Sequence, residues 1–273
     1  MNRTKQLGII IWLMVAMLVS CGGSNTQKPR GENRKSTPAT PSRQMADVWS
    51  WRIVEEYPHS TESYTQGLQY VDGVMWESTG QHGMSHLQRI DLATGKVEVV
   101  ASLDKREFGE GMTFYKGRIY QLTWLSERAY VYDSDGRLVD TLTYKGEGWG
   151  ITTDGQTLYM SDGTSTIRRV NPETMVTENS IFVTLDGHPL DMLNELEWID
   201  GKIWANVYMT YSIVVIDPAT GVVEAYIDLP QLDNSKHNPK ADVLNGIAYD
   251  SATGRIFITG KNWDKLYQIE ITK

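Results

Sequence analysis

From residue 64 onward, apolar and polar residues alternate in short runs that are separated by turn residues. Alternation with a period of two is typical of half-buried β-strands, and no window after residue 48 shows a sustained helical period. Residue pairs that suit the positive φ angles of tight hairpins separate first strands from second strands; they are Asp72-Gly73, Lys116-Gly117, Asp154-Gly155 and Asp200-Gly201. The chain is therefore predicted to be all-β, with few helices.

This strand pattern occurs five times, and each copy has a small residue at a fixed point of its first strand. The matching residues are Gly67, Gly111, Gly150, Leu196 and Gly246, which are spaced by 44, 39, 46 and 50 residues. Spacings of this size are typical of four-stranded propeller blades, whose innermost strands approach closely around a channel. A β-sandwich also has short strands at even spacing, but it does not require this repeated small residue. We predict a five-bladed β-propeller.

The two ends of the repeat region predict how the ring closes. The fifth copy, which ends at Lys273, has room for only about three strands. The segment Trp49 to Tyr57, WSWRIVEEY, is a lone strand without a copy of its own. We expect it to pair into the last blade as the outer strand, which leaves no long free edge.

In a propeller, equivalent positions of the innermost strands converge on one axis, so the repeat also predicts a pocket. The residues just before the small position are Gln66, Glu110, Trp149, Glu195 with its neighbour Asn194, and Asn245. The ends of the second strands reach the same rim and include Glu77, Trp124, Asn206, Tyr208, Lys261 and Trp263. Such a polar set is costly to bury without partners, which favours a functional site. Glu110 stands out because two glycines flank it and burial there would raise its pKa.

Charge and composition exclude several classes of function. The formal net charge is −8 and the pI about 5.2, so we expect no nucleic-acid partner. The single cysteine excludes an internal disulfide framework and a thiolate-rich zinc site. The five histidines are scattered, and no nucleotide-binding glycine motif is present, so no catalytic metal or cofactor is expected. A structural calcium stays open, because its ligands leave little trace in sequence.

The first 48 residues predict export and anchoring. Residues 1–20 have Arg3 and Lys5 ahead of an apolar run, as in a secretory signal peptide. The run ends in Leu18-Val19-Ser20-Cys21, which resembles the lipobox of bacterial lipoproteins and makes Cys21 the predicted lipidation site. Residues 21–48 read as a flexible, lipid-anchored tether, and residues 49–273 as the catalytic propeller. The expected location is the cell envelope, anchored to a bacterial membrane on its periplasmic or cell-surface side.

Strings at the blade positions resemble one known family. FGEG at Phe108, GEGWG at Gly146 and LNELE at Leu193 occur in order, together with TQGL, ESTG, QLTW and ANVY. They resemble the plant-type glutaminyl-peptide cyclotransferases, which are also found in bacteria, over about residues 57–273. The resemblance implies a five-bladed propeller that cyclises N-terminal glutamine of peptides to pyroglutamate and releases ammonia without a catalytic metal.

The resemblance also implies roles for the pocket residues. Glu110 matches the family's FGEG glutamate and is the expected general acid and base. Lys261, Asn194 or Gln66 would stabilise the amide oxygen, and Trp124 and Trp149 would enclose the side chain. The other predicted substrate contacts are Glu77 and Glu195, which could hold the α-amine, and Asn206, Tyr208, Asn245 and Trp263. The family pattern often has a tryptophan where this chain has Tyr208.

Two other functions compete with this hypothesis. A non-catalytic, peptide-binding propeller on the cell envelope would use the same polar rim for recognition alone, and fold does not exclude it. A hydrolase with paired carboxylates, Glu110 and Glu195, would need a defined distance between them. For the favoured enzyme the expected partners are peptides or proteins that begin with glutamine, and we expect a monomer.

Overall fold

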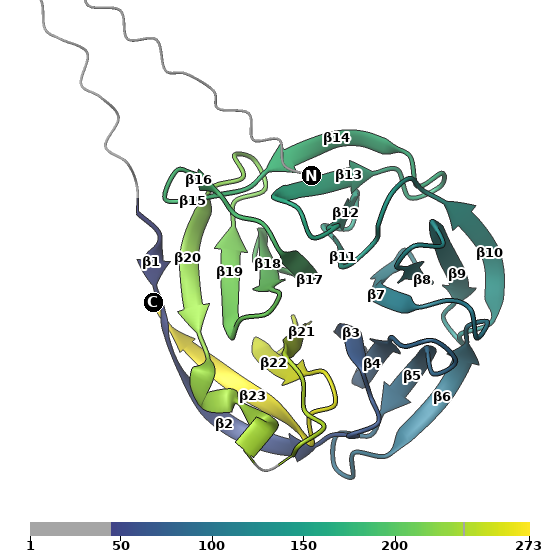
Figure 1. The fold of residues 1–273 in the computed structure, drawn as a ribbon, viewed down its shortest axis with the longest axis horizontal. Helices are drawn as coiled ribbons and strands as arrows, with labels where there is room; N and C mark the ends of the chain where they lie inside the picture. Colours follow the sequence, from purple (N-terminus) through teal and green to yellow (C-terminus); the bar gives the residue numbers. More distant parts are fainter. Residues whose placement is uncertain (1–44, 237) are drawn as a thin grey trace, which may run out of the picture. The chain divides into compact units, whose positions relative to one another are not determined.

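The computed structural model describes residues 45–236 and 238–273, in which five sheets of four or five strands are arranged around a central axis (Figure 1). Each of these sheets is one blade, and its innermost strand is the first in sequence once the N-terminal segment before residue 59, which closes the ring, is left aside. These innermost strands are β3 (Thr65–Val71), β7 (Gly109–Tyr115), β11 (Ile151–Thr153), β17 (Leu193–Ile199) and β21 (Leu244–Asp250). The predicted five-bladed β-propeller is confirmed.

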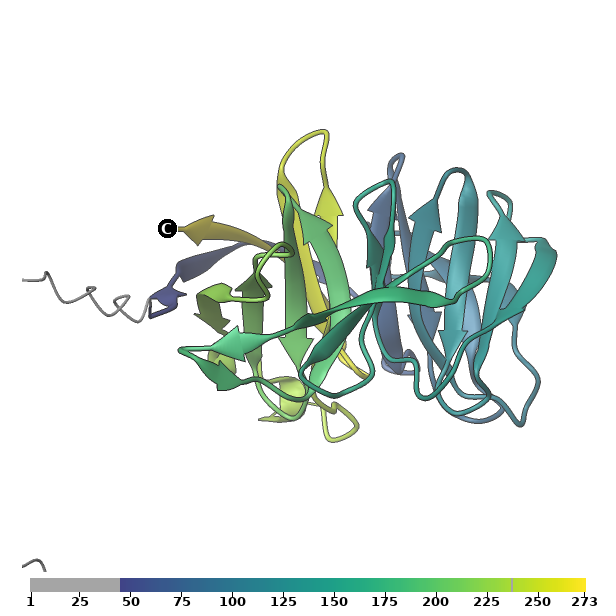
Figure 2. The ribbon, with the colours of Figure 1, turned by 90° about the horizontal axis from the view of Figure 1, so that it is seen from above.

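The remaining strands follow one another outward within each blade (Figure 1). Figure 2 shows the same ring edge-on, with most strands running along its axis. Blade 1 continues with β4 (Val74–Thr79), β5 (His86–Ile90) and β6 (Val97–Ser102), and blade 2 with β8 (Arg118–Thr123), β9 (Arg128–Asp133) and β10 (Leu138–Thr143). Blade 3 continues with β12 (Leu158–Met160), β13 (Thr166–Val170) and β14 (Thr177–Phe182). Blade 4 continues with β18 (Lys202–Val207), β19 (Ser212–Ile216) and β20 (Val223–Asp228), and blade 5 with β22 (Arg255–Gly260) and β23 (Lys265–Thr272).

The connections add little regular structure to the blades. A small hairpin of β15 (Thr184–Leu185) and β16 (His188–Pro189) lies between blades 3 and 4 in the chain. Two short 3-10 helices, η1 (Pro230–Leu232) and η2 (Asn234–Lys236), lie between β20 and β21. No helix in the described ranges is long and apolar enough to cross a membrane.

The N-terminal segment closes the ring across two blades (Figure 1). Strand β2 (Ser50–Pro58) pairs antiparallel with β23 over its whole length, as predicted for the lone strand. The preceding strand β1 (Asp47–Val48) pairs parallel with β20 of blade 4 and begins before residue 49. The sequence pattern did not predict β1, because two residues are too short to show alternation. One continuous segment thus joins blade 4 to blade 5.

The hairpin turns follow the prediction with one exception. At Asp72-Gly73 both residues have positive φ angles, 49° and 86°. At Asp154-Gly155 only Gly155 is positive, with φ 86°. The Asp154 carboxylate instead accepts hydrogen bonds from the backbone N–H groups of Gln156 and Thr157, at 2.8 and 2.7 Å. Its side chain therefore stabilises a different turn, and the predicted positive φ at Asp154 was wrong.

Glycines allow the innermost strands to meet at the channel. A Cβ atom on Gly67 would lie 2.5 Å from the Met112 backbone nitrogen, and one on Gly150 would lie 2.1 Å from the Asn194 carbonyl oxygen. Both distances are shorter than any real Cβ contact, so a larger residue would push adjacent blades apart. Leu196, the equivalent residue of blade 4, packs into the apolar core instead. The predicted close approach is confirmed at the glycines.

Candidate active site

A cavity of about 280 Å³ opens at the end of the channel where the innermost strands begin. Every blade contributes to its wall, although the residues are far apart in sequence. The wall consists of Tyr64, Gln66, Phe108, Glu110, Trp124, Trp149, Asn194, Tyr208 and Lys261. Seven of these nine were predicted from the repeat. The volume is at the lower end for ligand pockets, which suits one end of a peptide rather than a long segment.

β-Bulges place the predicted pocket residues on four of the innermost strands. The strand registers shift between Thr65 and Gly67, between Gly109 and Met112, between Leu193 and Leu196, and between Leu244 and Ile247. The residues inside these irregularities include Gln66, Glu110, Asn194 and Asn245. A bulge interrupts the alternation of side chains and is common beside active sites, because it redirects a side chain. The bulges therefore decide which polar groups reach the cavity.

Glu110 is the acidic residue of the cavity wall, and its side chain is almost completely buried. Burial raises its pKa well above the ordinary value; the positive charge of Lys261 acts in the opposite direction, and the Glu147 carboxylate adds to the rise. Within the described residues, no protein group donates a hydrogen bond to its carboxyl oxygens. The raised pKa makes the Glu110 carboxyl group a candidate proton donor to a ligand in the cavity.

Lys261 of blade 5 supplies a buried amino group to the cavity wall. Its Nζ atom lies 4.8 Å from the ring centroids of both Tyr64 and Tyr208. Burial lowers the pKa of Lys261, whereas the carboxylates of Glu110 and Asp242 oppose that shift. Aromatic faces stabilise a cation that has lost its water. Lys261 can therefore donate hydrogen bonds to an oxygen on which negative charge develops.

Two amide side chains complete the polar part of the wall. Asn245 Nδ2 donates to Gln66 Oε1 at 3.2 Å and to the Thr65 carbonyl oxygen at 3.0 Å. This contact fixes the orientation of Gln66, so that its Nε2 group is directed away from Asn245. The side-chain oxygen of Asn194 is buried, and none of the described residues donates to it. A buried, unpaired acceptor in a cavity wall favours a ligand that donates a hydrogen bond.

Aromatic rings form most of the remaining wall. Phe108 makes edge contacts with Tyr64 and Trp124, at centroid distances of 6.1 and 5.8 Å, and Trp149 contacts Tyr208 at 5.5 Å. Sequence reasoning missed Tyr64 and Phe108. Each lies three residues before the small residue of its copy, so the repeat alignment itself contained the signal. The rings give the cavity a rigid apolar lining with polar groups at defined points.

Five predicted substrate contacts lie outside the cavity wall, and the first is Glu195. Its Oε1 accepts from the Leu68 backbone N–H at 3.3 Å, and its Oε2 accepts from the Ile247 N–H at 2.9 Å. Burial raises its pKa to about 8, although these hydrogen bonds lower it. Glu195 thus links the innermost strands of blades 1, 4 and 5. This position corrects its predicted contact with the substrate and gives no support to a paired-carboxylate hydrolase.

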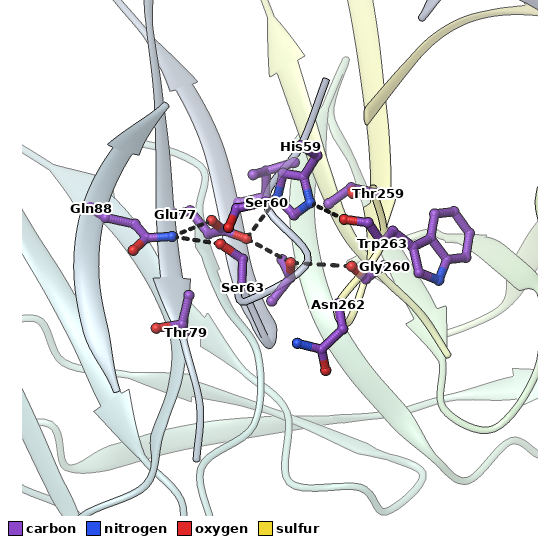
Figure 3. A network of polar contacts seen from close by, with 12 residues as sticks. His59, Ser60, Ser63, Glu77, Thr79, Gln88, Thr259, Gly260, Asn262 and Trp263 are labelled. Atoms are coloured by element: carbon purple, nitrogen blue, oxygen red, sulfur yellow. Dashed lines mark hydrogen bonds and ion pairs between the residues drawn. The ribbon is translucent and has the colours of Figure 1, made fainter. Parts of the chain in front are cut away.

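Glu77 also has a different role from the predicted one (Figure 3). It accepts hydrogen bonds from Thr65 Oγ1 at 2.6 Å and Gln88 Nε2 at 2.6 Å, and it lies 3.1 Å from His59 Nε2. Burial opposes both charges, but the pairing together with the other hydrogen bonds outweighs it, so the pKa of His59 is raised and that of Glu77 lowered. The two residues form a buried ion pair. Glu77 is fully occupied by protein groups and does not contact the cavity.

The other three residues support the wall from behind. Asn206 Oδ1 accepts from the Gly246 backbone N–H at 3.0 Å, and Asn245 orients Gln66 as described above. Trp263 is 0% exposed, packs against Gly260 and donates from Nε1 to the Asp242 carbonyl oxygen at 2.8 Å. None of the three belongs to the cavity wall, and Trp263 is packed in the core. Asn206 Nδ2 and Asn245 Oδ1 are buried and have no partner among the described residues, so the predicted substrate contacts of these two asparagines stay predictions.

The described residues contain no group of three or more His, Cys, Asp or Glu side chains arranged to hold a metal ion. The cavity wall presents one carboxyl group, one amino group, two amides and an aromatic lining. All of them are placed by the blade repeat and its bulges. Fold and site together define a five-bladed propeller with a binding pocket for a small polar group at one end of its channel.

Comparison with known proteins identifies the family. Residues 24–271 match the model of the glutamine cyclotransferase family. A glutaminyl-peptide cyclotransferase of Arabidopsis thaliana is 41% identical over 226 residues, which cover 80% of this chain and 70% of the relative. The chain belongs to the glutamine cyclotransferase family. The predicted enzyme class, glutaminyl-peptide cyclotransferase, is confirmed.

Solved structures agree with this identification. The crystal structure of Myxococcus xanthus glutaminyl cyclase matches with a TM-score of 0.76 and 33% identity, covering 83% of this chain and 98% of that one. An aldose sugar dehydrogenase of Streptomyces coelicolor matches with a TM-score of 0.51 and 10% identity, covering 84% and 100%. The second likeness concerns the fold alone. The family membership therefore rests on the sequence match and on the first structure.

Proposed function

We propose that this enzyme cyclises the N-terminal glutamine of a peptide to pyroglutamate, with Glu110 as general acid and base and with no catalytic metal. The observation that carries the proposal is the buried carboxyl group of Glu110, which accepts no hydrogen bond from the described residues and lies in the wall of a cavity of suitable size. The leaving group, ammonia, departs only after the amide nitrogen is protonated. A carboxylic acid with a raised pKa can supply that proton near neutral pH.

The reaction needs only proton transfers within one bound residue. The free α-amine of the glutamine attacks its own side-chain carbonyl carbon, and a C–N bond forms. Glu110 gives its proton to the amide nitrogen, the old C–N bond breaks, and ammonia leaves. The attacking nitrogen returns a proton to the Glu110 carboxylate, which restores the acid. Because both reacting groups belong to the same residue, holding it in a folded conformation contributes much of the acceleration.

The other wall residues have complementary tasks in this proposal. Negative charge develops on the amide oxygen during attack, and the Lys261 ammonium is the buried cation able to stabilise it. The free side-chain oxygen of Asn194 can accept a hydrogen bond from the α-amine, and Gln66 Nε2 can donate to the ligand. Trp124 and Trp149 enclose the apolar part of the glutamine side chain and exclude water.

The test measures ammonia released from a short peptide that begins with glutamine. We expect release by the wild type, none from the same peptide with N-terminal alanine, and a loss of about 10²–10⁴ in kcat for Glu110→Gln. Activity should persist after treatment with EDTA and should not rise on addition of calcium. Near-normal turnover by Glu110→Gln would remove the catalytic assignment. Peptide binding without ammonia from the wild type would favour the non-catalytic alternative.

We further propose that the protein is a lipoprotein of the bacterial cell envelope, anchored through Cys21. Residues 1–44 lie outside the described part of the chain, so this proposal rests on the lipobox-like Leu18-Val19-Ser20-Cys21 and on the tether composition. Cys21→Ala should move the enzyme from the membrane fraction to the soluble fraction with its activity intact. Retention of this variant in the membrane fraction would contradict the proposal.

A further inference from the structure

One carboxylate contacts the cavity wall from outside, and neither the repeat nor the reaction has given it a role. Glu147 Oε2 accepts a hydrogen bond from Trp124 Nε1 at 2.7 Å and another from Trp149 Nε1 at 2.9 Å. Trp124 follows a strand of blade 2, whereas Trp149 precedes the first strand of blade 3. A single oxygen atom therefore joins the two indole walls of the cavity across a blade boundary.

The repeat shows why Glu147 occupies this place. It lies three residues before Gly150, the position that holds Tyr64 before Gly67 and Phe108 before Gly111. In blades 1 and 2 an aromatic ring fills this position and lines the cavity. Blade 3 has a carboxylate there, behind the wall. It bridges Trp124 and Trp149 by hydrogen bonds, whereas the two rings make no direct contact in the described part of the chain.

The backbone of Glu147 is itself held firmly. The guanidinium group of Arg168 donates to the carbonyl oxygens of Glu147 and Lys145, the latter at 2.6 Å. The next residue, Gly148, donates its N–H to the Trp124 carbonyl oxygen at 3.2 Å. The acceptor is thus fixed before any ligand arrives. An anchored acceptor keeps both indoles in one orientation, which a free tryptophan side chain would not maintain.

We propose that Glu147 is a positioning residue of the enzyme, which fixes Trp124 and Trp149 as the two indole walls around the bound glutamine. The inference rests on the proposed function, because it assigns these walls to substrate binding. Glu147 does not line the cavity, so it acts through the indoles rather than on the substrate. Its charge has a second effect, since it is one of the groups that raise the pKa of Glu110.

The first test is Glu147→Ala, with Glu173→Ala as the matched control on an exposed turn of the same blade. Hydrogen bonds to a charged group are strong, so we expect KM for a glutamine peptide to rise about tenfold or more, and kcat to fall less. The control should stay within about twofold. In a Trp124→Phe, Trp149→Phe background, which lacks both donors, Glu147→Ala should add less than about threefold. An equal effect in that background would overturn the proposal.

The second test is Glu147→Gln, which keeps an oxygen acceptor but removes the charge. We expect KM within about threefold of the wild type. The alkaline limb of the kcat/KM profile should move to lower pH, because Glu110 then loses its proton more easily. An unshifted kcat/KM profile would overturn the proposed effect of the Glu147 charge on Glu110. This measurement on Glu147→Gln tests the role of Glu147 even if Glu147→Ala does not fold. Wild-type protein that releases no ammonia would instead refute the proposed function.

Discussion

Burial of the single residue Glu110 lowers the stability of the fold at high pH and at the same time provides a carboxyl group with a raised pKa. Its side chain is 4% exposed, it receives no hydrogen bond from the described residues, and burial raises its pKa well above the usual range. The repeat and its two flanking glycines identified this residue. The sequence could not show what modifies this effect of burial, because Lys261 lowers the pKa and Glu147 raises it, and these residues come from blades 5 and 3.

The raised pKa predicts how stability depends on pH. Above the unfolded pKa of a glutamate, about 4.3, the unfolded chain releases this proton while the folded protein retains it. Stability is therefore lost as pH rises toward the folded pKa. Glu110→Gln should be more stable than the wild type at pH 8, with a difference that shrinks toward pH 4. Urea unfolding of both proteins at these two pH values measures it, and a wild type that is more stable at pH 8 would contradict the assignment.

At the scale of strands, the bulges decide which residues reach the cavity. The repeat predicted both Asn194 and Glu195 as pocket residues because they are adjacent in LNELE. The structure brings Asn194 to the cavity and turns Glu195 to the backbone of the neighbouring blades. Adjacent strand residues face opposite sides, but the register shift at this point removes that simple rule. Sequence alternation alone could not separate the two.

The strands approach so closely at Gly150 that a larger residue there should disturb both stability and substrate binding. An alanine Cβ there would lie 2.1 Å from the Asn194 carbonyl oxygen, so the strand that carries Asn194 must move. Gly150→Ala should lower the unfolding free energy by about 1–3 kcal/mol and raise KM for the glutamine peptide. Gly155→Ala is the control: its Cβ meets nothing within 4 Å, so only its positive φ adds strain. Thermal unfolding and kinetics of both variants test this prediction. Equal KM values for Gly150→Ala and Gly155→Ala would contradict it.

At the scale of the whole molecule, ring closure depends on the segment that follows β2. His59 comes directly after this strand and contacts Glu77 of blade 1 as well as the carbonyl oxygen of Trp263, which lies between β22 and β23 of blade 5, at 2.9 Å (Figure 3). Thr65 and Gly260, which precede Gln66 and Lys261, contact the same network. The closure therefore supports one side of the cavity.

Removing one partner of the His59–Glu77 ion pair should weaken the contacts that close the ring and so destabilise the protein. Glu77→Gln is expected to lower the unfolding free energy by about 3–5 kcal/mol, because it leaves a buried His59 charge without its partner. The control Glu62→Gln removes an exposed pair with Lys240 and should change stability little. The contribution of Glu77 should disappear as pH falls through its lowered pKa, and that of His59 as pH rises through its raised pKa. Equal stability of the two variants in urea would contradict this role.

The sequence by itself determined the blade count, the closing strand, the family and most of the cavity wall. These features repeat along the chain, since strand alternation, hairpin turns and the small residue at the channel are local and recur in each blade. Only the tertiary structure decided that Tyr64 and Phe108 line the cavity, that Glu77 and Glu195 hold blades together, and that Trp263 belongs to the core. A side chain's role at the channel depends on strand bulges and on partners from other blades, and no short stretch of sequence contains both.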